Sequence, residues 1–393
     1  MLPRVKINYL NGLIGAAPDN QDGLLLMVVV GAAAVGTTFE LGKAYRLVSA
    51  GSLASLGVTA TNNARVHELV GQFYAEAEEG TPLYVAGVSG SSMASACDVS
   101  TGSVKGILEG LRGAVRGLIV ASAATTTPTV TEGLDPDVFA AVPKAQALAD
   151  HMADDLYAPV FAVIEGRSYT ASSTLKDLTE LDCNRVAVFI GDTASGSKGA
   201  AVGTLAGRIA SVPVQRNIGR VASGPLAPAS MYLGSALVDD AMDAVDDAYA
   251  KGYITPRIYT GLTGYYFTDD CMAVAKTDDY AHLTARRTAD KAARIAYATL
   301  LQFLLDEIEV NTDGTMQAPV LKGWQAAVET AVDTQMTANG ELSVVDGSGC
   351  RFFIDATQNV LATSKVEGTL RVRPFGYARE IVANIGFLTN IEN

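Results

Sequence analysis

The sequence carries little charge for its size. Asp, Glu, Lys and Arg make up 18% of its 393 residues, below the roughly 25% of an average soluble domain. Hydrophobic residues make up 49%. This excludes a mainly disordered chain, because disorder needs high charge and few apolar side chains. A weakly charged surface favours a subunit that buries much of itself in an assembly.

Positive charge is especially scarce. The chain has 29 Lys and Arg against 42 Asp and Glu, which gives a formal net charge of −13. Because phosphate contacts need clustered positive charge, we do not expect nucleic acid as a partner. Like charges form no long block either, so an electrostatic tail is not expected.

Cysteine and histidine are few and scattered. The four cysteines are Cys97, Cys183, Cys271 and Cys350, and no CxxC or Cys/His cluster occurs. Zinc-site spacing is therefore missing, and a disulfide framework is not expected. We expect buried thiols, no metal site and no cofactor.

Long hydrophobic runs are missing as well. The longest one, LLLMVVVGAAAV at 24–35, is shorter than the ~20 residues that a membrane helix needs. The first residues, MLPRVKINYL, lack the apolar region of a signal peptide. We therefore expect a protein made in the cytoplasm, with no membrane insertion.

Apolar runs and helical stretches alternate between residues 23 and 212, and this alternation predicts an α/β body with a mostly parallel sheet. The runs are nearly continuous in apolar residues, as expected for strands covered on both faces. The predicted strands are 24–30, 83–88, 116–121, 159–165 and 185–190. The predicted helices between them are 63–79, 102–112, 137–157, 173–181 and 199–211.

The rest of the chain has a different pattern. Segment 213–228 is irregular and rich in Pro and Gly, and 254–275 has two β segments around turns. This order predicts an α+β region. Its predicted helices are 235–251, 280–310 and 319–339, and its later strands are 341–345, 351–354, 365–373 and 379–388.

Two glycine-rich segments resemble nucleotide-binding turns. In VVVGAAAVG, Gly31 and Gly36 follow a predicted strand, but the GxGxxG spacing is missing. In IGDTASGSKGAA, at 190–201, the glycines keep the phosphate-loop spacing, but Lys198 comes one residue late. An α/β enzyme that binds a nucleotide or small substrate at one of these loops stays open as an alternative.

Two further segments suggest other kinds of catalysis. SGSSMASA, at 89–96, resembles the nucleophile segment of subtilisin-like proteases, with Ser92 as the nucleophile. A triad also needs a base, and none of the three histidines has the sequence context of one. The acid-rich VDDAMDAVDDAYA, at 238–250, has its Asp residues at helical spacing. It therefore favours a solvated or interface-facing surface over a catalytic carboxylate pair.

Both ends of the chain have the alternation of a strand. Near the N-terminus, apolar and polar residues alternate with period two, and a turn-rich segment follows. The C-terminal REIVANIGF alternates more loosely. A strand at a terminus has nothing local to pair with, so it must join its own sheet or that of another molecule.

The C-terminal half resembles a known family. A Gly/Pro-rich segment at 220–228 precedes a helix, followed by the β pair with GYYFTDDCMAVA and by HLTARRTADKAARIAYATLLQFL. The chain closes with EGTLRVRPFGYAREIVANIGF. This order is similar to the C-terminal region of contractile-tail sheath proteins, found in phages, R-type pyocins and related injection systems. Arg286, Arg287 and Asp290 match the family's Arg-rich helix.

The resemblance implies a structural subunit without enzyme activity. Such subunits polymerise helically, in six-fold rings, around an inner tube, and the sheath contracts to drive the tube through an envelope. The implied partners are further copies, the inner tube protein, and baseplate and terminator proteins. The implied location is the bacterial cytoplasm during assembly and then a phage tail or injection particle. Another tail or capsid-type assembly protein is an alternative.

The resemblance also implies that terminal arms add strands to neighbouring subunits. The expected arms are 1–22 and 379–393, which flank an α/β body at 23–212 and a sheath-like α+β region at 213–378. The expected arm residues are Arg4, Val5, Lys6, Ile7, Asn8, Tyr9, Glu380, Ile381, Val382, Ile385 and Phe387, with hinge positions at Gly12, Gly15 and Pro18. The expected polar contact surface is Asp239, Asp243, Asp246, Arg286, Arg287 and Asp290.

Overall fold

The computed structural model describes residues 21–126, 128–171 and 174–387. The chain forms two compact units, divided between Phe303 and Leu304. The first unit therefore continues past the division that we expected after residue 212, and it includes the irregular segment that follows. Among the described residues, no helix is long and apolar enough to cross a membrane.

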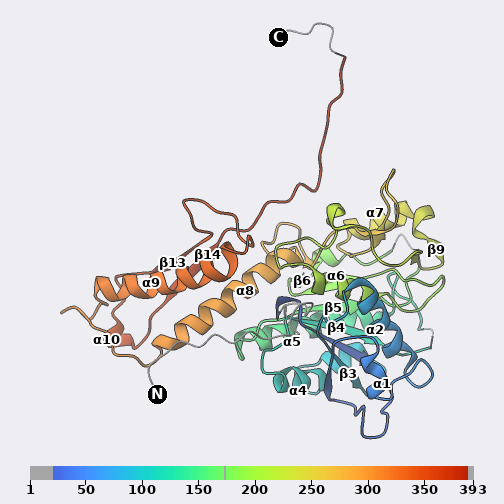
Figure 1. The fold of residues 1–393 in the computed structure, drawn as a ribbon, viewed down its shortest axis with the longest axis horizontal. Helices are drawn as coiled ribbons and strands as arrows, with labels where there is room; N and C mark the ends of the chain where they lie inside the picture. Colours follow the sequence, from blue (N-terminus) through green and yellow to red (C-terminus); the bar gives the residue numbers. More distant parts are fainter. Residues whose placement is uncertain (1–20, 127, 172–173, 388–393) are drawn as a thin grey trace, which may run out of the picture. The chain divides into compact units, whose positions relative to one another are not determined.

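A six-stranded sheet forms the centre of the first unit, in the order β2-β3-β1-β4-β5-β7. Figure 1 labels its strands β3, β4 and β5. The pairs are parallel except for β2 with β3, which is antiparallel. All residues of β1, β4, β5 and β7 are buried, which explains their continuous apolar sequences. The bounds are β1 Leu25–Val30, β2 Ala44–Leu47, β3 Leu83–Val88, β4 Gly117–Ser122, β5 Phe161–Glu165 and β7 Val186–Phe189.

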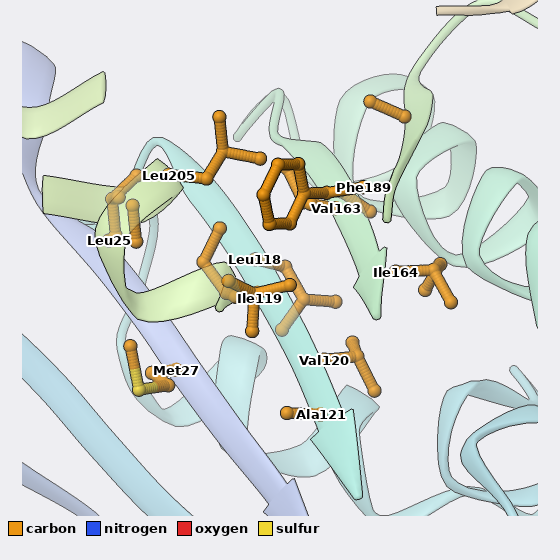
Figure 2. Close-up of a cluster of buried hydrophobic side chains, with 14 of the residues drawn as sticks. Leu25, Met27, Leu118, Ile119, Val120, Ala121, Val163, Ile164, Phe189 and Leu205 are labelled. Carbon is orange, nitrogen blue, oxygen red and sulfur yellow. The ribbon is translucent and has the colours of Figure 1, made fainter. Parts of the chain in front are cut away.

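Helices cover both faces of this sheet. From β1 the chain crosses to β3 on one side, and from β3 it returns past β1 to β4 on the other side. Because such crossovers are right-handed, the two directions place their helices on opposite faces of the sheet. The first set is α2 (Ala64–Glu76) with α6 (Val202–Ser211), and the second is α3 (Met93–Cys97), α4 (Ser103–Gly110) and α5 (Pro136–Asp154). In Figure 2, Leu205 of α6 reaches the core side chains of β1, β4 and β7.

The close approach of α2 and α6 depends on two glycines. A Cβ atom on Gly203 would lie 2.2 Å from the carbonyl oxygen of Leu69, and one on Gly207 would lie 2.6 Å from that of Phe73. Since real contacts are longer, only glycine allows the two helix backbones to touch at these turns.

Shorter elements complete the first unit. Three two-residue strand pairs are β8 (Tyr232–Leu233) with β9 (Ala236–Leu237), β10 (Pro256–Arg257) with β11 (Tyr266–Phe267), and β6 (Asp182–Cys183) with β12 (Ala273–Val274). The remaining α-helices are α1 (Ser52–Ser55), α7 (Met242–Ala250) and α8 (Leu283–Leu300). Single 3-10 turns are Gln21–Gly23, Leu178–Glu180, Val221–Ser223, Val238–Asp240 and Leu301–Phe303.

The second unit is a two-stranded sheet on a helix. The strands β13 (Cys350–Ile354) and β14 (Gly368–Val372) pair in antiparallel fashion, and β13 packs on α9 (Ala318–Val332) (Figure 1). Alternate residues of β13 are buried and exposed, as expected for a sheet with one wet face. A π-helical turn, Asp333–Thr337, extends α9, and α10 (Val360–Thr363) lies between the strands in sequence.

The predicted fold class is confirmed: a mostly parallel α/β body is followed by an α+β region. Several predicted elements are wrong. Within 174–181 only a 3-10 turn forms, the helix predicted over 235–251 starts at Met242, and the long helix ends at Leu300. Segments 341–345 and 379–387 form no strand in the described structure. The edge strand β2 was not predicted, because its four residues show no clear period.

Candidate functional site

The two glycine-rich segments of the sequence meet at one pocket. It has a volume of about 540 Å³, and both Gly31 and the Ser197–Gly199 turn line it. It lies beyond the carboxyl ends of β1, β4 and β5, next to the start of α2. This is where the chain changes direction across the sheet, the usual ligand position in doubly wound folds. The alternative of an α/β enzyme therefore has a definite place in the structure.

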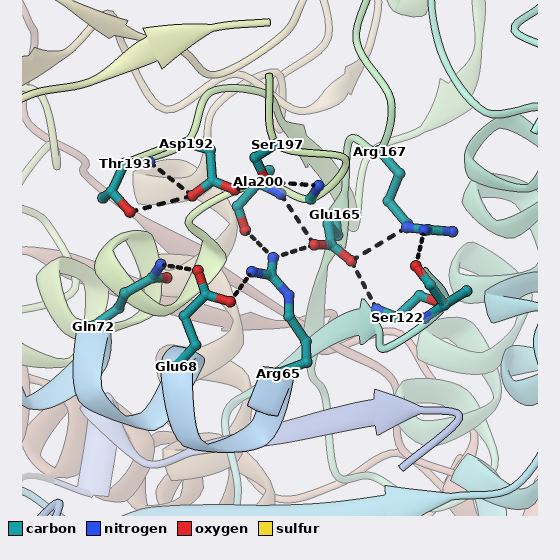
Figure 3. Close-up of polar contacts among 12 residues, drawn as sticks. Arg65, Glu68, Gln72, Ser122, Glu165, Arg167, Asp192, Thr193, Ser197 and Ala200 are labelled. Carbon is teal, nitrogen blue, oxygen red and sulfur yellow. Dashed lines mark hydrogen bonds and ion pairs between the residues drawn. The ribbon is translucent and has the colours of Figure 1, made fainter. Parts of the chain in front are cut away.

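A buried carboxylate lies beside this pocket. Glu165, at the end of β5, is fully buried. It accepts hydrogen bonds from the backbone N–H groups of Ser122, at 2.7 Å, and Ala200, at 3.0 Å, and it pairs with the guanidinium of Arg65 (Figure 3). Burial alone would lower the pKa of Arg65, but the carboxylates around it, Glu165 above all, raise it instead.

Two other cations of the pocket are also engaged within the chain. Arg167 donates to Asp135 at 3.1 Å and to the carbonyl oxygen of Ala124 at 2.6 Å. Lys198 donates to the carbonyl oxygen of Thr125 at 3.3 Å. Phosphate binding at such a turn requires N–H groups and cations that are available to the ligand. Here protein carboxylates and carbonyls engage these donors, so the arrangement ties strand ends together.

No histidine hydrogen-bonds Ser92 in the described structure. The Ser92 hydroxyl donates to Asp137 at 2.5 Å and accepts from the N–H of Ser95, which makes it the N-cap of α3. His151 contacts Asp155, and His282 contacts Asp270. This geometry is that of a helix cap.

Asp269, Cys271 and His282 place three potential metal-ligand atoms within 4.8 Å of one another. Hydrogen bonds within the chain engage the carboxylates of this region. Asn217 donates to Asp269 at 2.5 Å and to the neighbouring Asp270 at 2.9 Å. Asp270 also accepts from the N–H of Thr284 at 2.7 Å, which fixes the first turn of α8. Burial alone would raise the pKa of Asp270, but the hydrogen bond with His282 and others hold it low.

Three residues of the expected polar contact surface are buried, so that part of the prediction is wrong. Arg286, Arg287 and Asp290 are 8%, 3% and 3% exposed. Asp290 pairs with Arg286 at 3.2 Å and with Arg185, which precedes β7, at 3.0 Å. Arg287 donates to backbone carbonyls at the end of α6. These side chains hold α8 onto the sheet unit.

The acidic residues of the same expected surface are exposed. Asp239 lies in the 3-10 turn before α7, and Asp243 and Asp246 lie on α7 itself. Asp239 accepts a hydrogen bond from the hydroxyl of Tyr265 at 2.6 Å. Burial and this carboxylate raise the pKa of Tyr265 to about 12. Contact of this surface with another molecule stays a prediction.

The C-terminal arm residues are almost fully exposed and have no regular secondary structure. Ile381, Val382, Ile385 and Phe387 are 83%, 73%, 98% and 102% exposed, and Glu380 is also exposed. The expected N-terminal arm residues, Arg4, Val5, Lys6, Ile7, Asn8 and Tyr9, and the hinge positions Gly12, Gly15 and Pro18 lie outside the described residues.

Comparison with known families identifies the chain. Residues 2–271 match the family described as DUF2586, N-terminal domain, and residues 279–392 match DUF2586, C-terminal domain. The chain belongs to the DUF2586 family. No curated protein matches its sequence.

Contractile sheath proteins are among the solved structures to which this fold is similar. The sheath of an extracellular contractile injection system, PVC, in its contracted state aligns with a TM-score of 0.64 at 15% identity, over 100% of this chain and 98% of that one. The contracted helical sheath of the anti-feeding prophage aligns with a TM-score of 0.59 at 13% identity, over 98% and 99%. A sheath tail protein from Desulfitobacterium hafniense aligns with a TM-score of 0.51 at 10% identity, over 95% and 100%. This DUF2586 chain has the contractile-sheath fold, and the resemblance seen in its sequence is confirmed.

Proposed function

We propose that this DUF2586 chain is the subunit of a contractile sheath that polymerises around an inner tube and drives the tube outward. The observation that carries the proposal is the match of the whole chain, both units included, to sheath proteins of two injection systems. Sequence identity of 13–15% limits the match itself to the fold, so the assembly and the stroke are our inference.

Exposed apolar strand-like residues supply a means of polymerisation. Ile381, Ile385 and Phe387 share one side of an extended segment, because their spacing is even. Exposing such side chains in water is unfavourable by roughly 25 cal/mol per Å², so burial against another molecule would stabilise the complex. A segment of this kind adds to the edge of a neighbouring sheet through backbone hydrogen bonds.

The second unit offers a sheet with free edges. In the described part of the chain β13 and β14 form a two-stranded sheet, so each strand has one edge to which a further strand could be added. A donor segment at one end of the chain and an acceptor sheet elsewhere make the contact head-to-tail, and such contacts generate rings or open helices. The N-terminal segment is proposed to link subunits in the same way, with Gly12, Gly15 and Pro18 as hinges.

The proposed stroke requires no catalytic site. Subunits held in a strained lattice on the tube relax together to a wider, better-packed lattice, and the arms keep them linked. We propose no enzyme activity, no cofactor and no nucleic acid. The proposed partners are the inner tube, baseplate and terminator proteins, and the proposed location is the bacterial cytoplasm during assembly and then the particle.

Negative-stain electron microscopy of the purified chain tests the proposal. Hollow ridged tubes or stacked rings are the expected result. Uniform small particles at every concentration would contradict it, and closed shells would favour a capsid-type assembly instead. A rise in melting temperature with added nucleotide would favour the enzyme alternative at the 540 Å³ pocket.

A further inference from the structure

Three side chains that can bind a metal ion converge where α8 begins. Asp269 and Cys271 lie on the segment before β12, and His282 is the N-cap residue of α8. Cys271 and His282 face each other in an isolated antiparallel bridge, and the backbone hydrogen bonds beside it are made by their neighbours, at 3.0 and 2.8 Å. Facing side chains come closest in a pair of this kind. Asp269 lies two residues before Cys271, so an extended segment places both on one side.

The possible ligand atoms of this trio are close together. One such atom from each residue lies within 4.8 Å of those from the other two. The oxygen Oδ2 of Asp269 is 3.9 Å from Nδ1 of His282. Around a tetrahedral zinc ion, with bonds of roughly 2.0–2.3 Å, ligand atoms are about 3.3–3.8 Å apart. Small side-chain rotations are therefore enough to bring the three atoms to a common ion.

The surroundings hold the trio in place. Asp269 and Cys271 are 4% and 6% exposed, whereas the side chain of His282 is 25% exposed, so an ion can enter from the His282 side. Asn217 donates to Oδ1 of Asp269 at 2.5 Å, which fixes that carboxylate. The fully buried Asp270 bonds the ring of His282 at 3.0 Å. A carboxylate that bonds the imidazole is a common outer partner of a metal-binding histidine, because it orients the ring.

We propose that Asp269, Cys271 and His282 bind one zinc ion, with a water molecule as the fourth ligand. Zinc accepts sulfur, nitrogen and oxygen ligands together, whereas the thiolate argues against magnesium or calcium. The Cys271 thiol gives its proton to water when the sulfur–zinc bond forms, and the thiolate and the Asp269 carboxylate then balance the charge of the ion. The ion is structural and takes part in no reaction. This site does not depend on the sheath function proposed above.

A bound ion would fix the start of α8 to the segment before β12. Asp269 and Cys271 lie in the N-terminal domain of the family and His282 lies in the C-terminal one, so the ion would join the two. A ligand that binds only the folded chain stabilises it by mass action. The sequence predicted no metal site because ten residues separate Cys271 from His282, which is not a zinc-site spacing. The antiparallel bridge brings these two residues together.

Cobalt provides the first test, because a cobalt–thiolate bond absorbs in the near ultraviolet and tetrahedral cobalt absorbs in the visible range. The full chain without an affinity tag is treated with a chelator, separated from it and titrated with Co²⁺ alone. One equivalent should produce both sets of bands, and added Zn²⁺ should remove them, since zinc binds such ligands more tightly. The absence of a thiolate band in excess Co²⁺ would overturn the proposal.

A matched pair of variants tests which sulfur binds. Cys271→Ser should lose the thiolate band and bind zinc at least about tenfold more weakly. Cys183→Ser is the control and should keep both properties. Cys183 is similarly buried, at 7% exposure, and lies on β6, which pairs with β12, but it is not one of the trio. A thiolate band that persists in Cys271→Ser would place the ion elsewhere and overturn the proposal.

The role of His282 is tested by melting temperature. The full chain should melt at a higher temperature when Zn²⁺ is added. In His282→Gln the amide can still bond Asp270 but is a poor zinc ligand, so the rise should be much smaller. An equal rise in both proteins would exclude His282 as a ligand and overturn the proposed site.

X-ray absorption of the zinc-loaded full chain needs no substitution, so it decides the question if a variant fails to fold. One sulfur at about 2.3 Å and nitrogen or oxygen atoms at about 2.0–2.1 Å are the expected shell. A shell of nitrogen and oxygen alone would overturn the proposal. None of these measurements requires polymer, so a negative result would leave the sheath proposal standing.

Discussion

The carboxylate of Asp22 lies 2.6 Å from the ammonium group of Lys291, a contact between residues 269 positions apart. Arg294 also reaches this carboxylate, at 3.5 Å. Next to Asp22, a Cβ atom on Gly23 would lie 2.4 Å from the carbonyl oxygen of Ala210 on α6. The start of the described chain is therefore fixed against both α6 and α8.

Asp22→Asn should destabilise the first unit. Burial, together with the neighbouring Arg116, lowers the pKa of Arg294 to about 10, so the cations here depend on nearby carboxylates. Removing a largely buried ionic partner costs about 2–3 kcal/mol, because a charge is left uncompensated. Urea denaturation would measure the loss. Asp279→Asn is the matched control, since Asp279 is exposed. An equal effect of both changes would contradict a stabilising contact between Asp22 and the cations of α8.

The sequence predicted the sheet well because burial on both faces leaves a simple signal. The continuous apolar runs 24–30 and 116–121 correspond to β1 and β4 with shifts of one residue. The polar network around Glu165 could not be predicted, because its members are far apart in the sequence. Glu165 and Arg65 are 100 positions apart, and no local pattern joins them. Arg286 and Arg287 were misplaced because charged residues are rarely buried unless they are paired, and their partners are equally distant in sequence.

The two faces of the C-terminal segment should differ in importance. Replacing Ile381, Ile385 and Phe387 by Ser removes the apolar face and should leave a folded monomer. Replacing Glu380 and Asn384 by Ser is the matched control and should preserve most polymerisation, because backbone hydrogen bonds and apolar burial supply most of the affinity. Size-exclusion chromatography and electron microscopy would distinguish the two.

Deleting residues 1–20 should also give a folded monomer. Intact tubes from that truncation would contradict the proposal that the N-terminal segment links subunits.

Charge reversal on α7 should change the salt dependence of assembly. Asp243→Lys with Asp246→Lys alters exposed carboxylates only. Asp239 is left unchanged, because its carboxylate accepts the hydrogen bond of the Tyr265 hydroxyl. Exposed ion pairs contribute ~0–1 kcal/mol each and are screened by salt. The polymerisation threshold should therefore shift at low salt and converge with that of the unchanged chain at high salt. Asp154→Lys with Asp279→Lys makes the same charge change at other exposed sites, and an identical shift would exclude a specific contact at α7.

Asp270 should make the first unit sensitive to acid. Burial opposes its ionisation, but hydrogen bonds with His282, Asp269 and the N–H of Thr284 hold its pKa below the ordinary value. A lowered folded-state pKa means that the stabilisation is complete above the unfolded value, about 3.9, and is lost as the pH falls through the folded value. Asp270→Asn should therefore lower the free energy of unfolding at pH 7 and reduce its fall towards pH 3. A parallel pH dependence in both proteins would contradict this role.

Glu165 provides the strictest test of whether the pocket at the strand ends is structural. Glu165→Gln leaves the guanidinium of Arg65 without its fully buried anion, and breaking a buried pair costs about 3–5 kcal/mol. Glu68→Gln is the matched control: it removes the other carboxylate that pairs with Arg65, at 2.8 Å, but that side chain is 43% exposed, so the expected cost is about 0–1 kcal/mol. Urea denaturation would give both values. If the pocket serves a ligand, the Glu165→Gln protein should instead be stabilised by an added anion, and that result would favour the enzyme alternative.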